Sequence, residues 1–188
     1  MRRLGLAALQ IDAEASGNFD LVEKEIRSVV KRFPWLRLVA LGELIVHGPS
    51  TEKAEPAGGP TEKRFQALAR DLDIWLVPGS MYEARGGQVY NMAPVIAPDG
   101  MIVSRYDKMF PFRPYEASVA SGSGYCVFDI PGIGRIGLVI CYDIWFPEVI
   151  RTLSAMGAEV ILAPTLTNTI DRDVEITIAR ANAATSQV

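Results

Sequence analysis

Residues 135–164 read RIGLVICYDIWFPEVIRTLSAMGAEVILAP, and this stretch decides the fold. The run Ile136–Ile140 is too apolar for a strand with one solvated face and is typical of a strand buried on both faces of a parallel sheet. A helix is expected to begin at Pro147, because proline suits the first turn, and to end at Gly157. Glu159–Ala163 then predicts a second strand. The stretch therefore predicts a β-α-β unit.

Cys141 follows the first strand of this unit. In open α/β sheets, ligands collect at the carboxyl ends of the strands, so this position favours a reactive thiol. The alternative is a small buried hydrophobic residue, which is common for cysteine in an apolar run. Cys126, the other cysteine, lies inside a predicted strand and is expected to be structural.

The rest of the chain alternates strands and helices. Further strands are expected at Leu4–Gln10, Arg37–Leu41 and Ile74–Val77, and antiparallel pairs at Gln88–Ala97 with Met101–Tyr106 and at Tyr125–Ile130 with Arg135–Ile140. Helices are expected at Asn18–Phe33, from a cap at Thr61, and from Asp171 or Asp173 to about Ala184. This order predicts one α/β domain with mixed sheets over residues 1–188. Because the alternation calls for another strand after Val188, we expect the domain to be incomplete at its C-terminal end.

Composition excludes several classes of function. A net charge of −3 with scattered basic residues does not indicate a nucleic-acid partner or an anionic membrane surface. No segment approaches the roughly 18 apolar residues of a membrane span. Two cysteines and one histidine, without a C-x-x-C pair, predict neither a disulfide framework nor a metal site, and favour a reduced, cytoplasmic setting.

A nucleophilic thiol needs a base, and the chain offers two candidates. His47 is the only histidine. Glu43 closes a buried strand and is expected at the same sheet edge as Cys141, where low polarity would raise its pKa toward neutral pH. The alternative for Glu43 is an ordinary solvated acid at a strand end.

The long loop 107–124, DKMFPFRPYEASVASGSG, holds Lys108 and Glu116 among aromatic residues and prolines. Long loops in compact domains are often functional, and this composition favours the wall of a shaped pocket. A lysine there could stabilise an oxyanion. The alternative is a surface ion pair of little energetic consequence.

Gly132, Gly134 and Gly137 match the spacing of the dinucleotide-binding fingerprint. That motif must follow a strand and open a helix, whereas here it precedes a strand. A hairpin turn is the favoured interpretation, with nucleotide binding as a weak alternative.

The order of Glu43, Lys108 in DKMFPFRPYE and Cys141 in GLVICYDIWFPEVIR resembles the nitrilase, or carbon–nitrogen hydrolase, superfamily. The similarity spans nearly the whole chain. It implies an αββα sandwich, a homo-oligomer formed across the helical face, and no metal or cofactor. It further implies that Glu43 is the general base, Lys108 the oxyanion stabiliser and Cys141 the nucleophile of a Glu-Lys-Cys triad.

The resemblance also implies supporting roles. Glu116 matches the family's second glutamate, which positions substrate and lysine, and the amide N–H of Tyr142 would complete the oxyanion hole. Members that prefer nitriles usually carry Cys-Trp-Glu, whereas this chain has Cys141-Tyr142-Asp143, so it looks like the amidase and carbamoylase branches. Trp145 and its apolar neighbours favour a neutral acyl group. The sequence departs from the pattern of the family in two ways. Leu41-Gly42 precedes Glu43 where a proline is common, and the chain is shorter than is usual for the family.

The expected function is therefore hydrolysis of a small-molecule amide to an acid and ammonia or an amine, through a cysteine thioester. An N-carbamoyl amidohydrolase or a nitrilase could use the same triad. A truncated, non-catalytic relative that only oligomerises is the alternative from another class.

Overall fold

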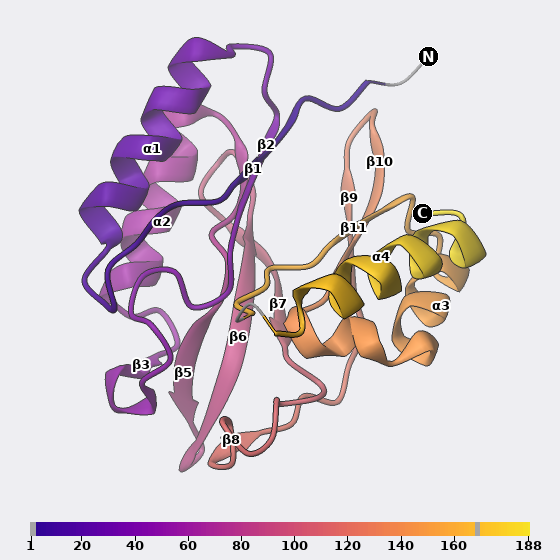
Figure 1. Cartoon of the computed structure of the whole chain (residues 1–188). Helices are drawn as coiled ribbons and strands as arrows, with labels where there is room; N and C mark the ends of the chain where they lie inside the picture. Colours follow the sequence, from indigo (N-terminus) through magenta and orange to yellow (C-terminus); the bar gives the residue numbers. More distant parts are fainter. Residues whose placement is uncertain (1–2, 168–169) are drawn as a thin grey trace.

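A computed structural model describes residues 3–167 and 170–188 as four layers, with two helices on each side of two stacked sheets (Figure 1). The first sheet is covered by helices α1 (Phe19–Arg32) and α2 (Pro60–Leu72), and helices α3 (Pro147–Ala155) and α4 (Arg172–Ser186) lie beside the second. The predicted αββα sandwich with mixed sheets is confirmed. Among the described residues, no helix is both long and apolar enough to cross a membrane.

The first sheet has the order β1-β2-β4-β6-β5-β3, with β7 and β8 also paired to β6. Its strands are β1 Leu6–Leu9, β2 Leu38–Leu41, β3 Glu55–Pro56, β4 Trp75–Val77, β5 Met81–Arg85, β6 Gln88–Ile96, β7 Ile102–Asp107 and β8 Val119–Ala120. β1, β2 and β4 are parallel, and β6 and β7 form the predicted antiparallel hairpin. Every residue of β2 is buried, as its apolar sequence predicts.

The second sheet has the order β11-β10-β9, with strands β9 Cys126–Ile130, β10 Gly134–Leu138 and β11 Val160–Leu162. β9 and β10 are antiparallel around a turn at Gly132, whose φ is +74°, so the glycine motif is a hairpin turn as predicted. β10 and β11 are parallel and are joined by helix α3, which confirms the predicted β-α-β unit.

The helices are α1 Phe19–Arg32, α2 Pro60–Leu72, α3 Pro147–Ala155 and α4 Arg172–Ser186, with single 3₁₀ turns at η1 Thr51–Lys53 and η2 Cys141–Trp145. Phe19, Val22 and Ile26 form the buried stripe of α1, at the spacing of three and four that the sequence shows.

Two local predictions are wrong. Thr61 does not cap α2, because Pro60 already occupies the first turn and the cap is Gly59; the Thr61 hydroxyl instead donates to Glu55 Oε1 at 2.6 Å. The first strand of the β-α-β unit ends at Leu138 rather than Ile140, and a 3₁₀ turn separates it from α3.

Two hydrophobic cores hold the layers together. The core between the sheets combines first-sheet residues such as Val77 and Val95 with second-sheet residues such as Phe128 and Leu138. The other core packs α1 and α2 on the outer face of the first sheet. The core between the sheets holds the two sheets face to face, so that residues following strands of either sheet can contribute to a single site.

Candidate active site

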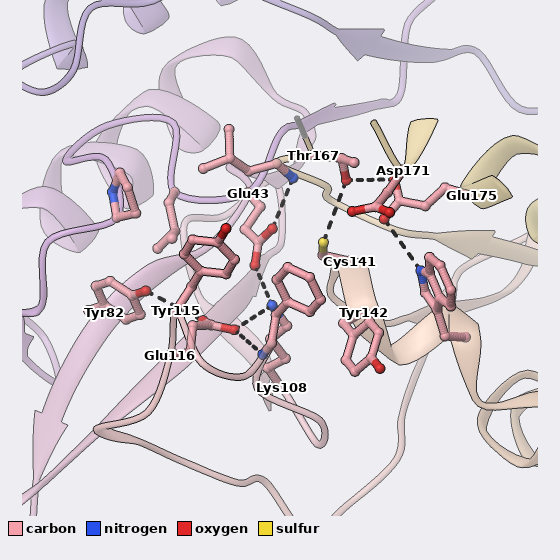
Figure 2. Close-up of a pocket in the computed structure, with 15 residues that line it drawn as sticks. Glu43, Tyr82, Lys108, Tyr115, Glu116, Cys141, Tyr142, Thr167, Asp171 and Glu175 are labelled. Carbon is pink, nitrogen blue, oxygen red and sulfur yellow. Dashed lines mark hydrogen bonds and ion pairs between the residues drawn. The ribbon is translucent and has the colours of Figure 1, made fainter. Parts of the chain in front are cut away.

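A cavity of about 340 Å³ lies where the strands of both sheets end (Figure 2). It is lined by Glu43, Leu44, Pro49, Tyr82, Lys108, Phe112, Tyr115, Glu116, Cys141, Tyr142, Trp145, Leu166, Thr167, Asp171 and Glu175. The six residues predicted for the site from the sequence are all in this set. The structure thus brings Glu43, Lys108 and Cys141 together from three separate segments of the chain.

Lys108 is the centre of the polar cluster. Its Nζ lies 2.8 Å from Glu43 Oε1 and 2.7 Å from Glu116 Oε2, and its side chain is only 1% exposed. Burial alone would lower the pKa of Lys108, but the neighbouring carboxylates of Glu43 and Glu116 raise it above its ordinary value. Lys108 is therefore protonated at neutral pH, and because it is buried the alternative of a surface ion pair is wrong.

Glu43 follows β2 in a tight turn. Leu44, the next residue, has a φ of +53°, and its N–H donates to Ser80 Oγ at 3.2 Å. Gly79 fits against this turn only because it lacks a side chain: a Cβ there would lie 1.8 Å from the carbonyl oxygen of Gly42. The Glu43 carboxylate is thus held by a closely packed backbone.

The environment of Glu43 changes its acidity. The residue is buried, and burial raises the pKa of its carboxyl above the ordinary value, with the Lys108 ammonium opposing the shift. Glu43 Oε2 accepts the N–H of Leu166 at 2.9 Å, a bond that crosses from the first sheet to the segment after β11. The alternative of a solvated strand-end acid is wrong.

Cys141 begins the 3₁₀ turn η2 with a φ of +48°, a left-handed conformation that non-glycine residues rarely adopt. Its N–H donates to Pro164 O at 2.9 Å, and its Sγ lies 3.9 Å from Thr167 Oγ1. Burial, together with the adjacent charge of Glu43, raises the pKa of the Cys141 thiol to about 12. The thiol is therefore protonated at neutral pH and needs a base to react.

Asp143 fixes the turn that carries Cys141. Its carboxylate is fully buried and accepts three hydrogen bonds, from the Tyr106 hydroxyl at 2.7 Å and from the N–H groups of Ile140 and Phe110 at 2.9 Å each. Tyr106 and Phe110 flank Lys108 in the sequence. Asp143 therefore ties the segment of the cysteine to the segment of the lysine.

Asn91 is a member of the cluster that was not predicted. Its Nδ2 donates to Glu43 Oε1 and to Glu116 Oε1, both at 2.8 Å. The predicted hairpin carries Asn91 on its first strand and ends at Tyr106, two residues before Lys108; in the structure the pairing continues, and the Lys108 N–H donates to Asn91 O at 2.8 Å.

Aromatic side chains form one wall of the cavity. Tyr142 packs against Phe112 and Trp145, with ring centroids 4.9 and 5.6 Å apart. The beginning of α4 adjoins this wall: Glu175 accepts the Thr167 hydroxyl at 2.6 Å and the indole N–H of Trp145 at 3.5 Å. The sequence did not indicate that α4 contributes to the site.

The other candidates from the sequence lie elsewhere. His47 does not line the cavity; its Nε2 lies 2.9 Å from Thr61 Oγ1 and 3.3 Å from Glu55 Oε1. Cys126 is buried on β9, with its sulfur 3.2 Å from Ser104 Oγ. Within residues 3–167 and 170–188, no cluster of three or more potential metal ligands is found.

Residues 3–188 match the family model of the carbon–nitrogen hydrolases. The chain belongs to the carbon–nitrogen hydrolase family. Membership of the nitrilase superfamily, predicted from the sequence, is confirmed. The match covers the segments that carry Glu43, Lys108 and Cys141.

Relatives and solved structures agree with this assignment. A deaminated glutathione amidase from Synechocystis is 33% identical over 175 residues, which cover 84% of this chain and 64% of that protein. The omega-amidase NIT2 of Pongo abelii is 28% identical over 175 residues, covering 86% of this chain and 62% of that protein. Nit3 of Saccharomyces cerevisiae, a member of the nitrilase superfamily, shares the fold with a TM-score of 0.90 at 24% identity, covering 100% of this chain and 73% of that chain. The chain thus spans a little under two thirds of the length of these two curated relatives.

Proposed function

We propose that this protein hydrolyses the carbon–nitrogen bond of a small amide, with Cys141 as nucleophile, Glu43 as general base and Lys108 as oxyanion stabiliser. The observation that carries the proposal is a buried lysine, bonded to two buried carboxylates, in the same cavity as a cysteine. Membership of the carbon–nitrogen hydrolase family and similarity to amidases support it.

The first step is acylation. Because the pKa of the Cys141 thiol is raised to about 12, sulfur attacks the amide carbonyl as its proton passes to Glu43, whose own pKa is raised by burial. The carbonyl oxygen becomes an oxyanion, which the Lys108 ammonium and the N–H of Tyr142 stabilise. The tetrahedral intermediate then breaks its carbon–nitrogen bond, Glu43 returns the proton to nitrogen, and ammonia or an amine leaves.

The second step is hydrolysis of the thioester. Glu43 accepts a proton from water, the hydroxide oxygen adds to the thioester carbonyl, and the oxyanion again forms beside Lys108. Collapse breaks the carbon–sulfur bond, the proton returns to Cys141, and the carboxylic acid is released. Each proton taken by Glu43 is returned, so the site is regenerated without a cofactor.

The substrate that suits the cavity has a neutral acyl group. Lys108 is the single cationic residue among the described residues that line the cavity, and it is already paired with Glu43 and Glu116. Asp171 and Glu175, at the beginning of α4, add negative charge to the lining of the cavity. A carboxylate on the acyl chain would meet no free cation there, so we propose that short, uncharged amides react faster than amides bearing a carboxylate.

Assembly and location are part of the proposal. Helix α4 carries the exposed apolar side chains Val174 and Ile176, which support a homo-oligomer across the helical face. The two cysteines are free thiols, in keeping with a cytoplasmic setting. N-carbamoyl compounds and nitriles remain the alternative substrates for the same triad.

The test is ammonia release from short aliphatic amides, amides bearing a carboxylate, N-carbamoyl compounds and nitriles. Glu43→Gln and Cys141→Ala should abolish turnover, whereas His47→Ala, outside the cavity, should leave most of it. Lack of turnover by the wild-type protein on the whole panel would favour the non-catalytic alternative. Retained turnover in Cys141→Ala, or its loss in His47→Ala alone, would contradict the assigned roles.

A further inference from the structure

Asn91 occupies an unusual place between two carboxylates. It lies on β6, is fully buried, and uses its single Nδ2 to donate to both Glu43 and Glu116 at 2.8 Å. Like charges so close repel strongly in a buried site. Lys108 offsets this repulsion with a charge, and Asn91 bridges the same two groups without adding one.

The hydrogen bonds distinguish the two oxygens of Glu43. Oε1 accepts from both Lys108 Nζ and Asn91 Nδ2, at 2.8 Å each. Oε2 accepts the N–H of Leu166 at 2.9 Å, and the Cys141 side chain is a further hydrogen-bond partner of the Glu43 carboxylate. A carboxylate oxygen with two donors has little remaining capacity, so Oε2 is the better proton acceptor.

The other end of the Asn91 side chain shows that this orientation has a cost. Among the described residues, its Oδ1 is buried and has no hydrogen-bond partner. An unpaired buried acceptor is unfavourable. Turning the amide over would give Oδ1 no donor either, because it would face two carboxylates. The two glutamates therefore set the orientation of the Asn91 amide, and its hydrogen bonds go to their carboxylates.

We propose that Asn91 is a positioning residue, which holds Glu43 so that Oε2 receives the proton of the Cys141 thiol and holds Glu116 against Lys108. This inference rests on the proposed function, because it assigns a role relative to the base and the nucleophile. The titratable groups that face Glu43 are Lys108, Glu116, Cys141 and Tyr82. Of these, Lys108 donates to the same carboxylate oxygen as Asn91, Glu43 Oε1.

The test is Asn91→Leu, with Asn18→Leu as the matched control. Asn18 is also a buried asparagine whose Nδ2 makes two donations, at 2.8 and 2.9 Å, but to the backbone carbonyls of Glu14 and Ile45. Two readouts are needed: kcat/KM for the best amide, and the rate at which iodoacetamide alkylates Cys141 as a function of pH, followed by peptide mass mapping. Unfolding in urea is measured in parallel.

Asn91→Leu should lower kcat/KM about 10- to 100-fold, as expected for hydrogen bonds to charged groups, mainly through kcat. Losing a donor to the ionised carboxylate raises the pKa of Glu43, so the acidic limb of both pH profiles should move to higher pH. Asn18→Leu should lower the unfolding midpoint and leave both profiles in place. Asn91→Ser, which keeps one donor, should give an intermediate shift, and it decides the matter if Asn91→Leu does not fold.

The outcomes separate the inference from the proposed function. Wild-type profiles in the folded Asn91 variants, with Glu43→Gln inactive, would overturn the role of Asn91 alone. If Glu43→Gln left both the alkylation of Cys141 and turnover unchanged, the proposed function itself would be overturned.

Discussion

Replacing Lys108 by methionine tests the central ion cluster. The change keeps most of the apolar stem and removes the charge that separates Glu43 from Glu116. At an effective dielectric constant of about 20, each contact of 2.7–2.8 Å has a Coulomb energy of about 6 kcal/mol. Desolvation offsets much of this, and removing one partner of a buried pair typically costs about 3–5 kcal/mol. We expect Lys108→Met to lower the free energy of unfolding by that amount at pH 8.

The loss should depend on pH in a definite direction. Burial raises the pKa of Glu43, and the Lys108 ammonium opposes that shift, so without the ammonium the pKa of Glu43 lies further above its unfolded value of about 4.3 and the folded variant binds more protons than the unfolded chain. Its stability therefore falls as pH rises from about 4.3 toward the raised pKa of Glu43, by up to about 1.4 kcal/mol per pH unit for the one additional proton held. The difference in free energy of unfolding between Lys108→Met and the wild type should be smallest near pH 5.

The assay is urea unfolding followed by tryptophan fluorescence at pH 5, 6.5 and 8, with turnover measured alongside. Lys63→Met, at an exposed position on α2, is the control and should change neither stability nor activity appreciably. Activity of Lys108→Met should fall by at least about 10²–10³, the usual loss for one oxyanion donor. A Lys108→Met protein as stable as the wild type, or a gap that does not change with pH, would refute the reasoning.

Gly79→Ala should lower the free energy of unfolding by about 3 kcal/mol or more, because the new Cβ would meet Gly42 O at a φ of +76°. Gly86→Ala, at a φ of +58° with open space around it, should cost only about 1 kcal/mol, and equal losses in the two variants would contradict the packing argument. Asp143→Asn should cost about 1–3 kcal/mol, because an amide cannot accept all three donors that the carboxylate accepts; an unchanged urea midpoint would show that these bonds contribute little.

Much of the fold could be predicted because its signals are local. A few neighbouring residues are enough to indicate the apolar strands β2 and β10, the buried stripe of α1 and the end of α3 before Gly157. The strand β5, Met81–Arg85, was missed because it mixes charged and apolar residues without a regular alternation. Its burial depends on pairing with β6 and on the ion pairs of Glu83, which only the tertiary structure provides.

The reactive residue types were predictable from their positions, but their supports were not. The order of Glu43, Lys108 and Cys141 is visible in the sequence, whereas the partners of Asn91 and Asp143 come from segments 25–48 and 33–37 residues away, apart from Ile140. The left-handed φ of Cys141 also has no signal in the residue type, since such positions usually favour glycine. Long-range hydrogen bonds and backbone strain therefore mark the limit of prediction from one sequence.

The site straddles the join between the two sheets. Glu43 and Lys108 follow strands of the first sheet and Cys141 follows a strand of the second, with the Leu166 N–H and the Asp143 carboxylate bonded across the gap. The Cys141 thiol is a hydrogen-bond partner of the Glu43 carboxylate, and a slip of one sheet along the other by one residue, about 3.3 Å, would break this contact. The rate of the proposed reaction therefore depends on how the two sheets are aligned. Trp75 and Phe128 pack between the sheets with ring centroids 5.8 Å apart, and a substitution that changes this contact would slow turnover although neither residue lines the cavity.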